Sequence, residues 1–102
     1  MLAAVFRYEV EPAGAQAFEA VYGPDGTWAR FFARGEGYAG TELWRGSDGR
    51  YLVIDRWSSE AAYEAFLDAH GDEYRRRSDA AERLYLSEEP LGRYHATGPM
   101  GL

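Results

Sequence analysis

Apolar side chains occupy every second position of residues 2–10, where Leu2, Ala4, Phe6, Tyr8 and Val10 alternate with Ala3, Val5, Arg7 and Glu9. This period of two is typical of a half-buried strand and predicts the first strand. Residues 38–45, which include two aromatic side chains, and residues 50–57 are predicted to be two further strands joined in a hairpin, because the turn sequence Gly46-Ser47-Asp48-Gly49 separates them. A shorter fourth strand is predicted over residues 91–96, after Pro90.

Helical spacing of apolar residues marks the segments between these strands. Residues 13–22 and a second short segment that ends at about Arg34 are predicted to be helical. Ser58 or Ser59 is expected to cap a longer helix, because a serine side chain accepts a backbone hydrogen bond at a helix start. The apolar stripe of that helix consists of Tyr63, Phe66, Leu67, His70 and Tyr74, and its pattern continues to Leu84. Gly71 is expected to kink or split this helix, and Pro90 to stop it.

The predicted order of elements is a strand, a helix in two pieces, two strands, a helix and a last strand. This order is the split βαβ plan, an α+β, ferredoxin-like fold with a four-stranded antiparallel sheet and the helices on one face. We expect a single domain over residues 1–96 and a flexible tail over residues 97–102.

Helices on one face leave the other face of the sheet uncovered, yet apolar residues occur on both. In the third predicted strand the two sets are Tyr51, Val53, Asp55 and Trp57 against Leu52, Ile54 and Arg56. In the second strand, Tyr38 and Trp44 are expected on one face and Leu43 on the other. A solvated face is usually polar, and a large exposed apolar patch usually marks an interface. We therefore expect a homodimer packed through the sheets; the alternative is a monomer with an apolar surface.

Composition narrows the classes of function. The chain has 102 residues and a net charge of −6 at pH 7, which disfavours nucleic acid and anionic membranes as partners. Cysteine is absent, which excludes a thiolate nucleophile, an iron–sulfur cluster and a cysteine zinc site. No apolar run approaches the length of a membrane span, and the stretch from Met1 to Arg7 lacks the pattern of a signal peptide. A cytoplasmic protein is expected.

Three segments are distinctive in their order along the chain. They are residues 22–28 (Tyr-Gly-Pro-Asp-Gly-Thr-Trp), residues 40–43 (Gly-Thr-Glu-Leu) and residues 55–59 (Asp-Arg-Trp-Ser-Ser), the last followed by Ala62, Tyr63 and Phe66. Together they resemble the antibiotic-biosynthesis-monooxygenase family, part of the dimeric α+β barrel superfamily. The resemblance extends over about residues 2–95 and implies the fold and the dimer. It says less about the reaction, because this fold hosts several.

In family members that oxidise aromatic polyketides, the resemblance implies a pocket between the sheet and the helices. A Trp at the end of the third strand, a Tyr early in the next helix and an Arg further along line that pocket. The matching residues here, and hence the expected catalytic residues, are Trp57, Tyr63 and Arg77. The expected substrate-binding residues are Val53, Phe66, His70 and Tyr74. The same enzymes place an Asn where this chain has Val53, which removes a hydrogen-bonding group.

The implied reaction requires neither a metal nor a flavin, so no cofactor is expected. A phenolic or quinol-like substrate can reduce dioxygen directly once it is deprotonated, if the protein binds the flat ring, stabilises the anion and excludes water. Trp57 and Tyr63 are suited to hold the ring, and Arg77 to stabilise its oxyanion. Tyr63 and Arg77 would lie about 21 Å apart on a straight helix, so both can serve one pocket only with a kink at Gly71.

Other interpretations of the same residues remain open. Trp57 and Tyr63 also fit a core, and Arg77 fits an ion pair with acidic neighbours on its helix. Asp55 is suited to act as a base if the pocket buries it, and otherwise to a salt bridge with an arginine. The leading interpretation is a cofactor-independent monooxygenase of an aromatic small molecule. The alternatives are a non-catalytic dimer that binds a hydrophobic molecule and a haem-binding relative that uses His70.

Overall fold

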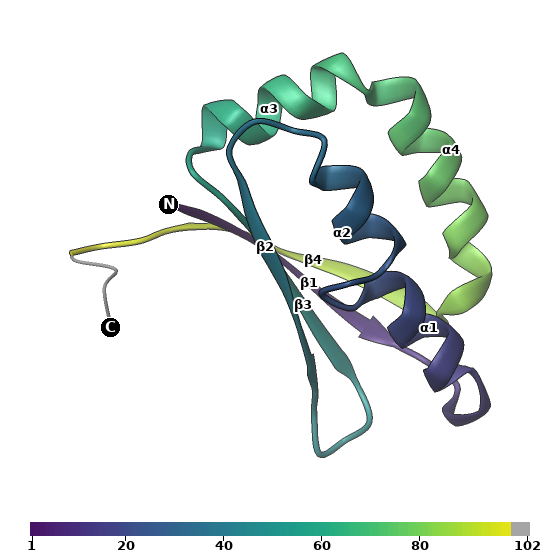
Figure 1. Cartoon of the computed structure of the whole chain (residues 1–102). Coiled ribbons are helices and arrows are strands. Elements are labelled where there is room, and N and C mark those ends of the chain that lie inside the picture. Colours follow the sequence, from purple (N-terminus) through teal and green to yellow (C-terminus); the bar gives the residue numbers. More distant parts are fainter. Residues whose placement is uncertain (99–102) are drawn as a thin grey trace.

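The strands and helices of the computed structural model, which describes residues 1–98, follow the predicted order (Figure 1). In chain order they are β1 (Leu2–Glu9), the 3-10 helix η1 (Pro12–Gly14), α1 (Ala15–Tyr22), α2 (Thr27–Phe32), β2 (Tyr38–Arg45), β3 (Tyr51–Trp57), α3 (Glu60–Ala69), α4 (Gly71–Ala81), the 3-10 helix η2 (Glu82–Leu84) and β4 (Ser87–His95). Residues 99–102 of the predicted tail lie outside the described residues.

The four strands form one antiparallel sheet in the order β2-β3-β1-β4. Figure 1 shows the helices together on one face of this sheet, which we call the inner face. The predicted α+β, ferredoxin-like split βαβ fold is therefore confirmed. Within residues 1–98, no helix has the length and apolar character needed to cross a membrane.

The inner face of the sheet carries the core. Every second residue of β3 is buried on this face: Tyr51, Val53, Asp55 and Trp57. On the neighbouring strand β1 the buried set is Leu2, Ala4 and Tyr8. Side chains alternate between the two faces of a strand, so this pattern follows directly from helices that cover one face only. The polar exception in the set is Asp55.

A β-bulge near the start of β2 corrects one prediction. The register of β2 against β3 shifts between Tyr38 and Gly40, so β2 has one extra residue there. As a result Tyr38 lies opposite Trp57 on the inner face, whereas Trp44 lies opposite Leu52 on the outer face. The expectation that Tyr38 and Trp44 share a face is wrong, because counting by twos does not allow for the bulge.

The last strand begins earlier than predicted and contains Pro90. β4 covers Ser87–His95 rather than residues 91–96. Its register against β1 shifts where Phe6 lies opposite Pro90 and Val5 opposite Gly92. Proline has no N–H to donate, so sheets tolerate it mainly in edge strands and at bulges. Pro90 meets both conditions, because β4 is an edge strand and the register shifts next to Pro90. The prediction that Pro90 stops the helix and precedes the strand is therefore wrong.

The helices agree more closely with the sequence pattern. Ser59 caps α3, since its Oγ accepts a hydrogen bond from the backbone N–H of Ala62 at 3.1 Å. The predicted split at Gly71 is confirmed, because α3 ends at Ala69 and α4 begins at Gly71. The chain changes direction at this break, so α3 and α4 cover different parts of the inner face (Figure 1). The predicted helix over residues 13–22 begins with η1 and becomes α-helical at Ala15.

Gly37 lies where the chain before β2 comes close to the start of α3, and Gly49, in the turn between β2 and β3, provides the comparison. Gly37 has φ 93°, and a Cβ there would lie 2.6 Å from Ser58 Oγ and 2.8 Å from Ala62 Cβ. Gly49 has φ 83°, but a Cβ there would meet nothing within 4 Å. We expect Gly37→Ala to lower the free energy of unfolding by about 2–4 kcal/mol, from strain and overlap together. Gly49→Ala should lower it by about 1–2 kcal/mol, from strain alone. Urea unfolding measures both, and equal losses would contradict the close approach.

Candidate active site

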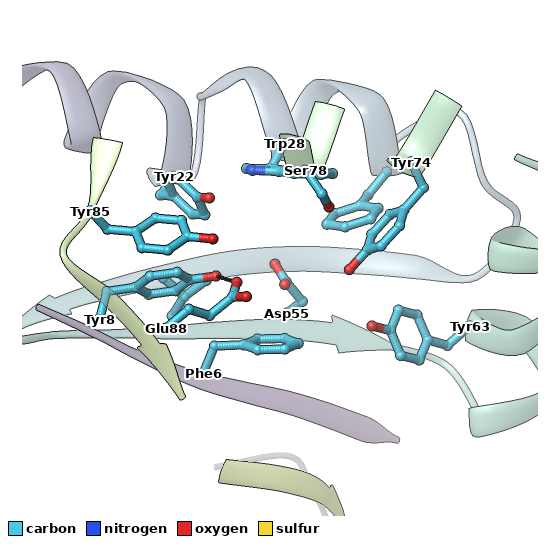
Figure 2. A pocket seen from close by; sticks show the side chains of 12 residues that line it. Phe6, Tyr8, Tyr22, Trp28, Asp55, Tyr63, Tyr74, Ser78, Tyr85 and Glu88 are labelled. Carbon is cyan, nitrogen blue, oxygen red and sulfur yellow. Dashed lines mark hydrogen bonds between the residues drawn. The ribbon is translucent and has the colours of Figure 1, made fainter. Parts of the chain in front are cut away.

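A cavity lies between the inner face of the sheet and the helices, and aromatic side chains form most of its wall (Figure 2). It is lined by Phe6, Tyr8, Tyr22, Trp28, Phe32, Val53, Asp55, Tyr63, Tyr74, Ser78, Tyr85 and Glu88. The space between these side chains, together with the open mouth of the cavity, has a volume of about 490 Å³. Much of this space is too narrow for water, because the centre of a water molecule fits in only about 30 Å³ of it. The cavity is therefore narrow, with room for about two or three water molecules.

Asp55 supplies a buried carboxyl to this cavity. Its side chain on β3 is directed into the cavity in Figure 2, and the residue is 6% exposed. Thr41, opposite on β2, donates a hydrogen bond from Oγ1 to Asp55 Oδ1 at 2.6 Å. Burial raises the pKa of Asp55 to about 6, while the Thr41 hydrogen bond opposes this rise. No ion pair of the described residues includes Asp55, so the salt bridge considered from the sequence is wrong.

Neutral hydroxyl groups and carboxyls make up the polar part of the wall. Five tyrosines contribute: Tyr8, Tyr22, Tyr63, Tyr74 and Tyr85. Burial raises the pKa of each, so all five are neutral O–H donors at physiological pH. Tyr8 donates to Glu88 Oε2 at 2.6 Å and thereby links β1 to β4. Among residues 1–98, no basic side chain lines the cavity, so an uncharged ligand suits this wall better than a carboxylate.

Trp57 and Tyr63 lie side by side, but only Tyr63 lines the cavity. Their ring centroids are 5.5 Å apart. Trp57 is 0% exposed and also packs against Tyr38 and Phe66. Its indole N–H is buried without a hydrogen-bond partner in the described part of the chain, as is that of Trp28 in the cavity wall. Trp57 therefore supports the ring of Tyr63 from behind, whereas Trp28 has a donor to spare beside the cavity.

The expected substrate-binding residues divide between two places. Val53 and Tyr74 line the cavity. Phe66 and His70 instead line a shallow surface groove beside residues 34–37. Their rings lie 4.5 Å apart, so His70 packs on Phe66. The structure thus brings Val53 and Tyr74 into the cavity and leaves Phe66 and His70 outside it.

Arg77 is also outside the cavity. Its guanidinium lies 4.7 Å from the ring centroid of Phe31. Arg77 Nε donates to Glu73 at 2.9 Å, and Arg34 donates to the same carboxyl at 2.7 Å. Hydrogen bonds from Arg34 and Arg77 hold the pKa of Glu73 below its ordinary value. The ion pair with an acidic helix neighbour, considered from the sequence as the alternative for Arg77, is formed.

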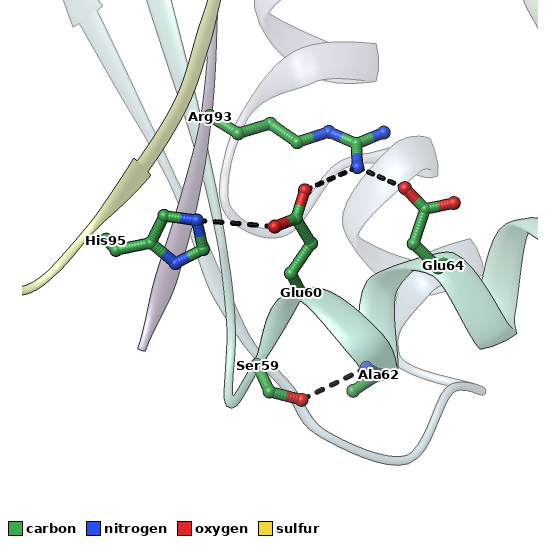
Figure 3. Close-up of polar contacts among 6 residues, drawn as sticks. All are labelled: Ser59, Glu60, Ala62, Glu64, Arg93 and His95. Carbon is green, nitrogen blue, oxygen red and sulfur yellow. Dashed lines mark hydrogen bonds and ion pairs between the residues drawn. The ribbon is translucent and has the colours of Figure 1, made fainter.

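A cluster of charges ties β4 to α3 beside the cavity (Figure 3). Arg93 of β4 donates to Glu60 at 2.9 Å and also to Glu64, both on α3. His95 Nε2 lies 3.3 Å from the Glu60 carboxylate. The Arg93 guanidinium lies 4.9 Å from the ring centroid of Tyr63. Arg93 therefore holds one face of the Tyr63 ring, while Trp57 packs against it from β3.

The model of the antibiotic biosynthesis monooxygenase family matches residues 1–76. The chain belongs to the antibiotic biosynthesis monooxygenase family. The matched residues include Asp55 and Tyr63, whereas Tyr85 and Glu88, which complete the wall of the cavity, follow them in the chain. No curated protein shows significant similarity to this member of the family.

Solved structures of similar proteins share the fold of this family member. SnoaB, a cofactor-independent oxygenase from Streptomyces nogalater, is 25% identical, with a TM-score of 0.69 over 99% of this chain and 97% of its own. A single-residue variant of SnoaB gives 27% identity and a TM-score of 0.70 over the same shares. ActVA-Orf6, a monooxygenase from Streptomyces coelicolor in complex with nanaomycin D, is 18% identical, with a TM-score of 0.71 over 97% of this chain and 89% of its own. This last similarity concerns the fold alone.

Several residues of this site were not among the site residues predicted from the sequence. The period-2 pattern of β1 puts Tyr8 on the same face as Leu2, so that signal could have found it. Glu88 precedes the predicted fourth strand, and its contact with Tyr8 depends on the register of β4 against β1. Arg93 reaches Tyr63 across the gap between β4 and α3, and no local pattern marks such a contact.

The raised pKa of Asp55 predicts how the stability of this monooxygenase-family protein depends on pH. A carboxyl with pKa 3.8 in the unfolded chain and about 6 in the folded one stabilises the fold fully below pH 3.8, and this contribution is lost as the pH rises through 6. Asp55→Asn replaces it with a neutral group of the same shape. We expect the substitution to raise the free energy of unfolding at pH 8 by about 2–3 kcal/mol, and by much less at pH 4.

Urea unfolding of the wild type and Asp55→Asn at both pH values measures this difference. Asp79→Asn is the matched control, because Asp79 is an exposed carboxyl of α4 and the chemical change is identical. The control should change the free energy of unfolding little at either pH. An Asp55→Asn effect that is the same at pH 4 and pH 8 would contradict the buried, ionised carboxyl.

Proposed function

We propose that the cavity binds a flat, uncharged, phenolic or quinol-like aromatic molecule and that the protein oxidises it with dioxygen, as a cofactor-independent monooxygenase. The observation that carries this proposal is Asp55, a buried carboxyl directed into an aromatic cavity. A general base is most effective when its pKa is close to the working pH, and burial moves the pKa of Asp55 in that direction. Family membership and the similarity to SnoaB support the class of reaction.

The proposed chemistry begins with proton transfer to Asp55. For a substrate whose reactive CH₂ lies between aromatic rings, the carboxylate takes one proton from carbon and leaves a delocalised anion. The anion passes one electron to dioxygen, and the two radicals join through a new C–O bond as a peroxide. Asp55 returns its proton to the outer peroxide oxygen. Loss of the remaining C–H proton and cleavage of the O–O bond release water and leave a ketone. Overall, CH₂ and O₂ become C=O and H₂O.

The wall of the cavity favours this sequence of steps. Buried tyrosine hydroxyls such as those of Tyr63 and Tyr74 are neutral donors that can stabilise a substrate oxyanion without reorganisation. The aromatic rings around them leave room for only a few water molecules, and this less polar surrounding strengthens those hydrogen bonds. Asp55 and Glu88 supply the carboxyls of the wall. A substrate that carries its own carboxylate would meet like charges there, so an uncharged substrate is proposed.

The three residues matched by the resemblance take unequal parts in this proposal. Tyr63 lines the cavity and is proposed as the donor to the developing oxyanion. Trp57 acts through Tyr63, since it packs behind that ring and does not line the cavity. Arg77 is further away: it stacks on Phe31, which is not in the cavity wall but packs against Trp28 of that wall, with ring centroids 5.9 Å apart. Trp57 and Arg77 are therefore positioning residues, and Tyr63 and Asp55 are the proposed catalytic residues.

Oxygen consumption with a panel of anthrones and quinols tests the proposed reaction. We expect turnover of uncharged members of the panel, incorporation of one atom of ¹⁸O from ¹⁸O₂ into the product, and a higher KM for analogues that carry a carboxylate. Asp55→Asn should lower kcat by about 10²–10⁴-fold, the usual contribution of a general base. An oxygen electrode and mass spectrometry provide the measurements.

The matched control is again Asp79→Asn, which should keep the wild-type kcat because Asp79 lies on the exposed side of α4. Wild-type turnover by Asp55→Asn would remove Asp55 from the mechanism. Saturable binding of panel members without oxygen consumption, in the wild type, would remove the proposed reaction.

A second candidate function is non-catalytic binding of a hydrophobic or aromatic small molecule. Val53 favours it, because the resemblance implies an Asn at this position in the enzymes that oxidise aromatic polyketides, and Val53 offers no hydrogen bond to the cavity that it lines. Ligand binding without product would support this candidate. The haem-binding alternative has its own test: a haemin Soret shift that is lost in His70→Ala.

We also propose that two copies of the chain pack through the outer face of the sheet. This face lies opposite the helices in Figure 1 and includes Leu52 and Ile54 of β3 and Trp44 of β2. Trp44 is 59% exposed, and Tyr94 of β4, opposite Ala3 on the same face, is 54% exposed. Covering such apolar surface stabilises an assembly by about 25 cal/mol per Å². A second copy is the occupant that the dimeric superfamily resemblance favours.

Sedimentation analysis tests this dimer. The wild type should sediment at twice the 11.5 kDa mass of the chain. Trp44→Glu puts a charge on the apolar outer face within the proposed contact and should yield the single-chain mass with the fold retained. Ala80→Glu adds the same charge at an exposed position of α4 and should remain dimeric. A wild type that sediments as one chain would exclude the proposed packing.

A further inference from the structure

Two hydroxyl groups form a chain that ends on the Asp55 carboxyl. Tyr38 Oη lies 2.5 Å from Thr41 Oγ1, and Thr41 Oγ1 donates to Asp55 Oδ1 at 2.6 Å. A threonine hydroxyl has a single hydrogen, and Thr41 uses it toward Asp55. Tyr38 must therefore donate to Thr41, so both hydrogen bonds are directed toward the carboxyl. Hydrogen bonds aligned in this way polarise and strengthen one another.

The bulge in β2 brings this chain together. Residues three positions apart on a regular strand point to opposite faces, so Tyr38 and Thr41 would ordinarily be separated by the sheet. The extra residue between Tyr38 and Gly40 turns Tyr38 to the inner face, where Thr41 already lies opposite Asp55. Gly40, with φ 119°, supplies the backbone conformation that this bulge requires. The bulge in β2 thus places the hydroxyl of Tyr38 within hydrogen-bond distance of Thr41.

The chain also leaves part of the carboxyl free. Thr41 binds Oδ1, and in residues 1–98 no hydrogen bond to Asp55 Oδ2 is formed. The carboxyl points into the cavity in Figure 2, so a bound molecule can reach the second oxygen. The hydrogen bond between Thr41 and Asp55 is buried, whereas that between Tyr38 and Thr41 is partly exposed. The two hydroxyls therefore reach the carboxyl along the inner face from the side of β2, and neither Tyr38 nor Thr41 lines the cavity.

We infer that Tyr38 and Thr41 are positioning residues for Asp55: their hydroxyls hold its carboxylate in the ionised form and fix Oδ1, so that Oδ2 remains for the substrate. The inference rests on the proposed function for what Asp55 acts on. It assigns a purpose to Thr41, the polar residue that is buried together with Asp55. It also explains how a carboxyl that is only 6% exposed remains able to ionise near neutral pH.

Other titratable groups face Asp55 from the surrounding elements, and each acts differently from Thr41. The tyrosines are Tyr8 of β1, Tyr22 of α1, Tyr63 of α3, Tyr74 of α4 and Tyr85 before β4, and all are neutral. The other carboxyl of the wall is Glu88, which accepts the hydrogen bond from Tyr8. Thr41 is thus the hydrogen-bond donor to Asp55 among these surroundings, and Tyr38 the donor behind it.

Substitutions in this chain give a specific signature in the pKa of Asp55. Thr41→Val removes the hydroxyl and keeps the shape, and should raise the pKa of Asp55 by about one to two units, the value of a hydrogen bond to a charged group. Tyr38→Phe should raise it by less than about one unit, because it removes only the polarising donor. Thr41→Ser keeps the hydroxyl and should restore the wild-type value. The acid limb of kcat/KM against pH should move to higher pH by the same amounts.

Carboxyl ¹³C NMR titration of the full chain measures the pKa of Asp55 directly, and Asp55→Asn and Glu88→Gln assign the resonances. If Thr41→Val leaves the pKa unchanged, or if Thr41→Ser shifts it as far as Thr41→Val does, the inference is overturned. Tyr38→Phe keeps the test open if Thr41→Val does not fold, since Tyr38 is only half-buried. The titration needs no substrate. Expected shifts without oxygen consumption would therefore support the positioning of the carboxyl and count against the proposed reaction alone.

Discussion

One carboxyl buried in an aromatic wall is the constraint on which this site depends. Taking an ionised Asp55 out of water is unfavourable, and the hydrogen bond from Thr41 offsets only part of the penalty, since the pKa remains raised at about 6. Apart from Thr41 and Asp55, the buried side chains of the described chain are aromatic or aliphatic, and their packing offsets this cost. The raised pKa of Asp55 makes the folded state less stable near neutral pH, and the same raised pKa enables the carboxylate to accept a proton.

The packing that creates the cavity also restricts it. A fused-ring ligand is far larger than the few water molecules for which the cavity has room, so side chains of the wall must move when such a ligand binds. On the sheet side, Val53 and Asp55 are held by ladder hydrogen bonds on both edges of β3. On the helix side, Tyr22 and Tyr74 belong to short helices held by tertiary packing. Opening is therefore expected from the helices, which leaves the position of the proposed base unchanged.

Local pattern predicted most of the fold, and non-local pairing decided the rest. The period of two predicted β1, the turn sequence over residues 46–49 predicted the hairpin of β2 and β3, and Gly71 predicted the break between α3 and α4. The bulge at Tyr38 and the register of Pro90 depend on pairing with the neighbouring strand, so the local sequence pattern could not predict them. In the site, Asp55 is visible from sequence as the polar residue in a buried set, whereas the contact of Glu88 with Tyr8 joins residues from opposite ends of the chain.

Val53 lacks the hydrogen-bonding group that the resemblance implies at its position, but Asp55 provides a polar group to the same cavity. Residues two apart on a strand point to the same face and lie about 7 Å from each other, so Val53 and Asp55 present neighbouring positions to one cavity. The resemblance implies an amide at the first of these positions, and this chain has a carboxyl at the second. An amide can only donate and accept hydrogen bonds, but a carboxyl can also take the proton itself. On β3 the polar group of this cavity is thus the carboxyl of Asp55, one pleat from Val53 toward Trp57, and an ionised carboxyl at that position can take a proton from a ligand as well as accept a hydrogen bond.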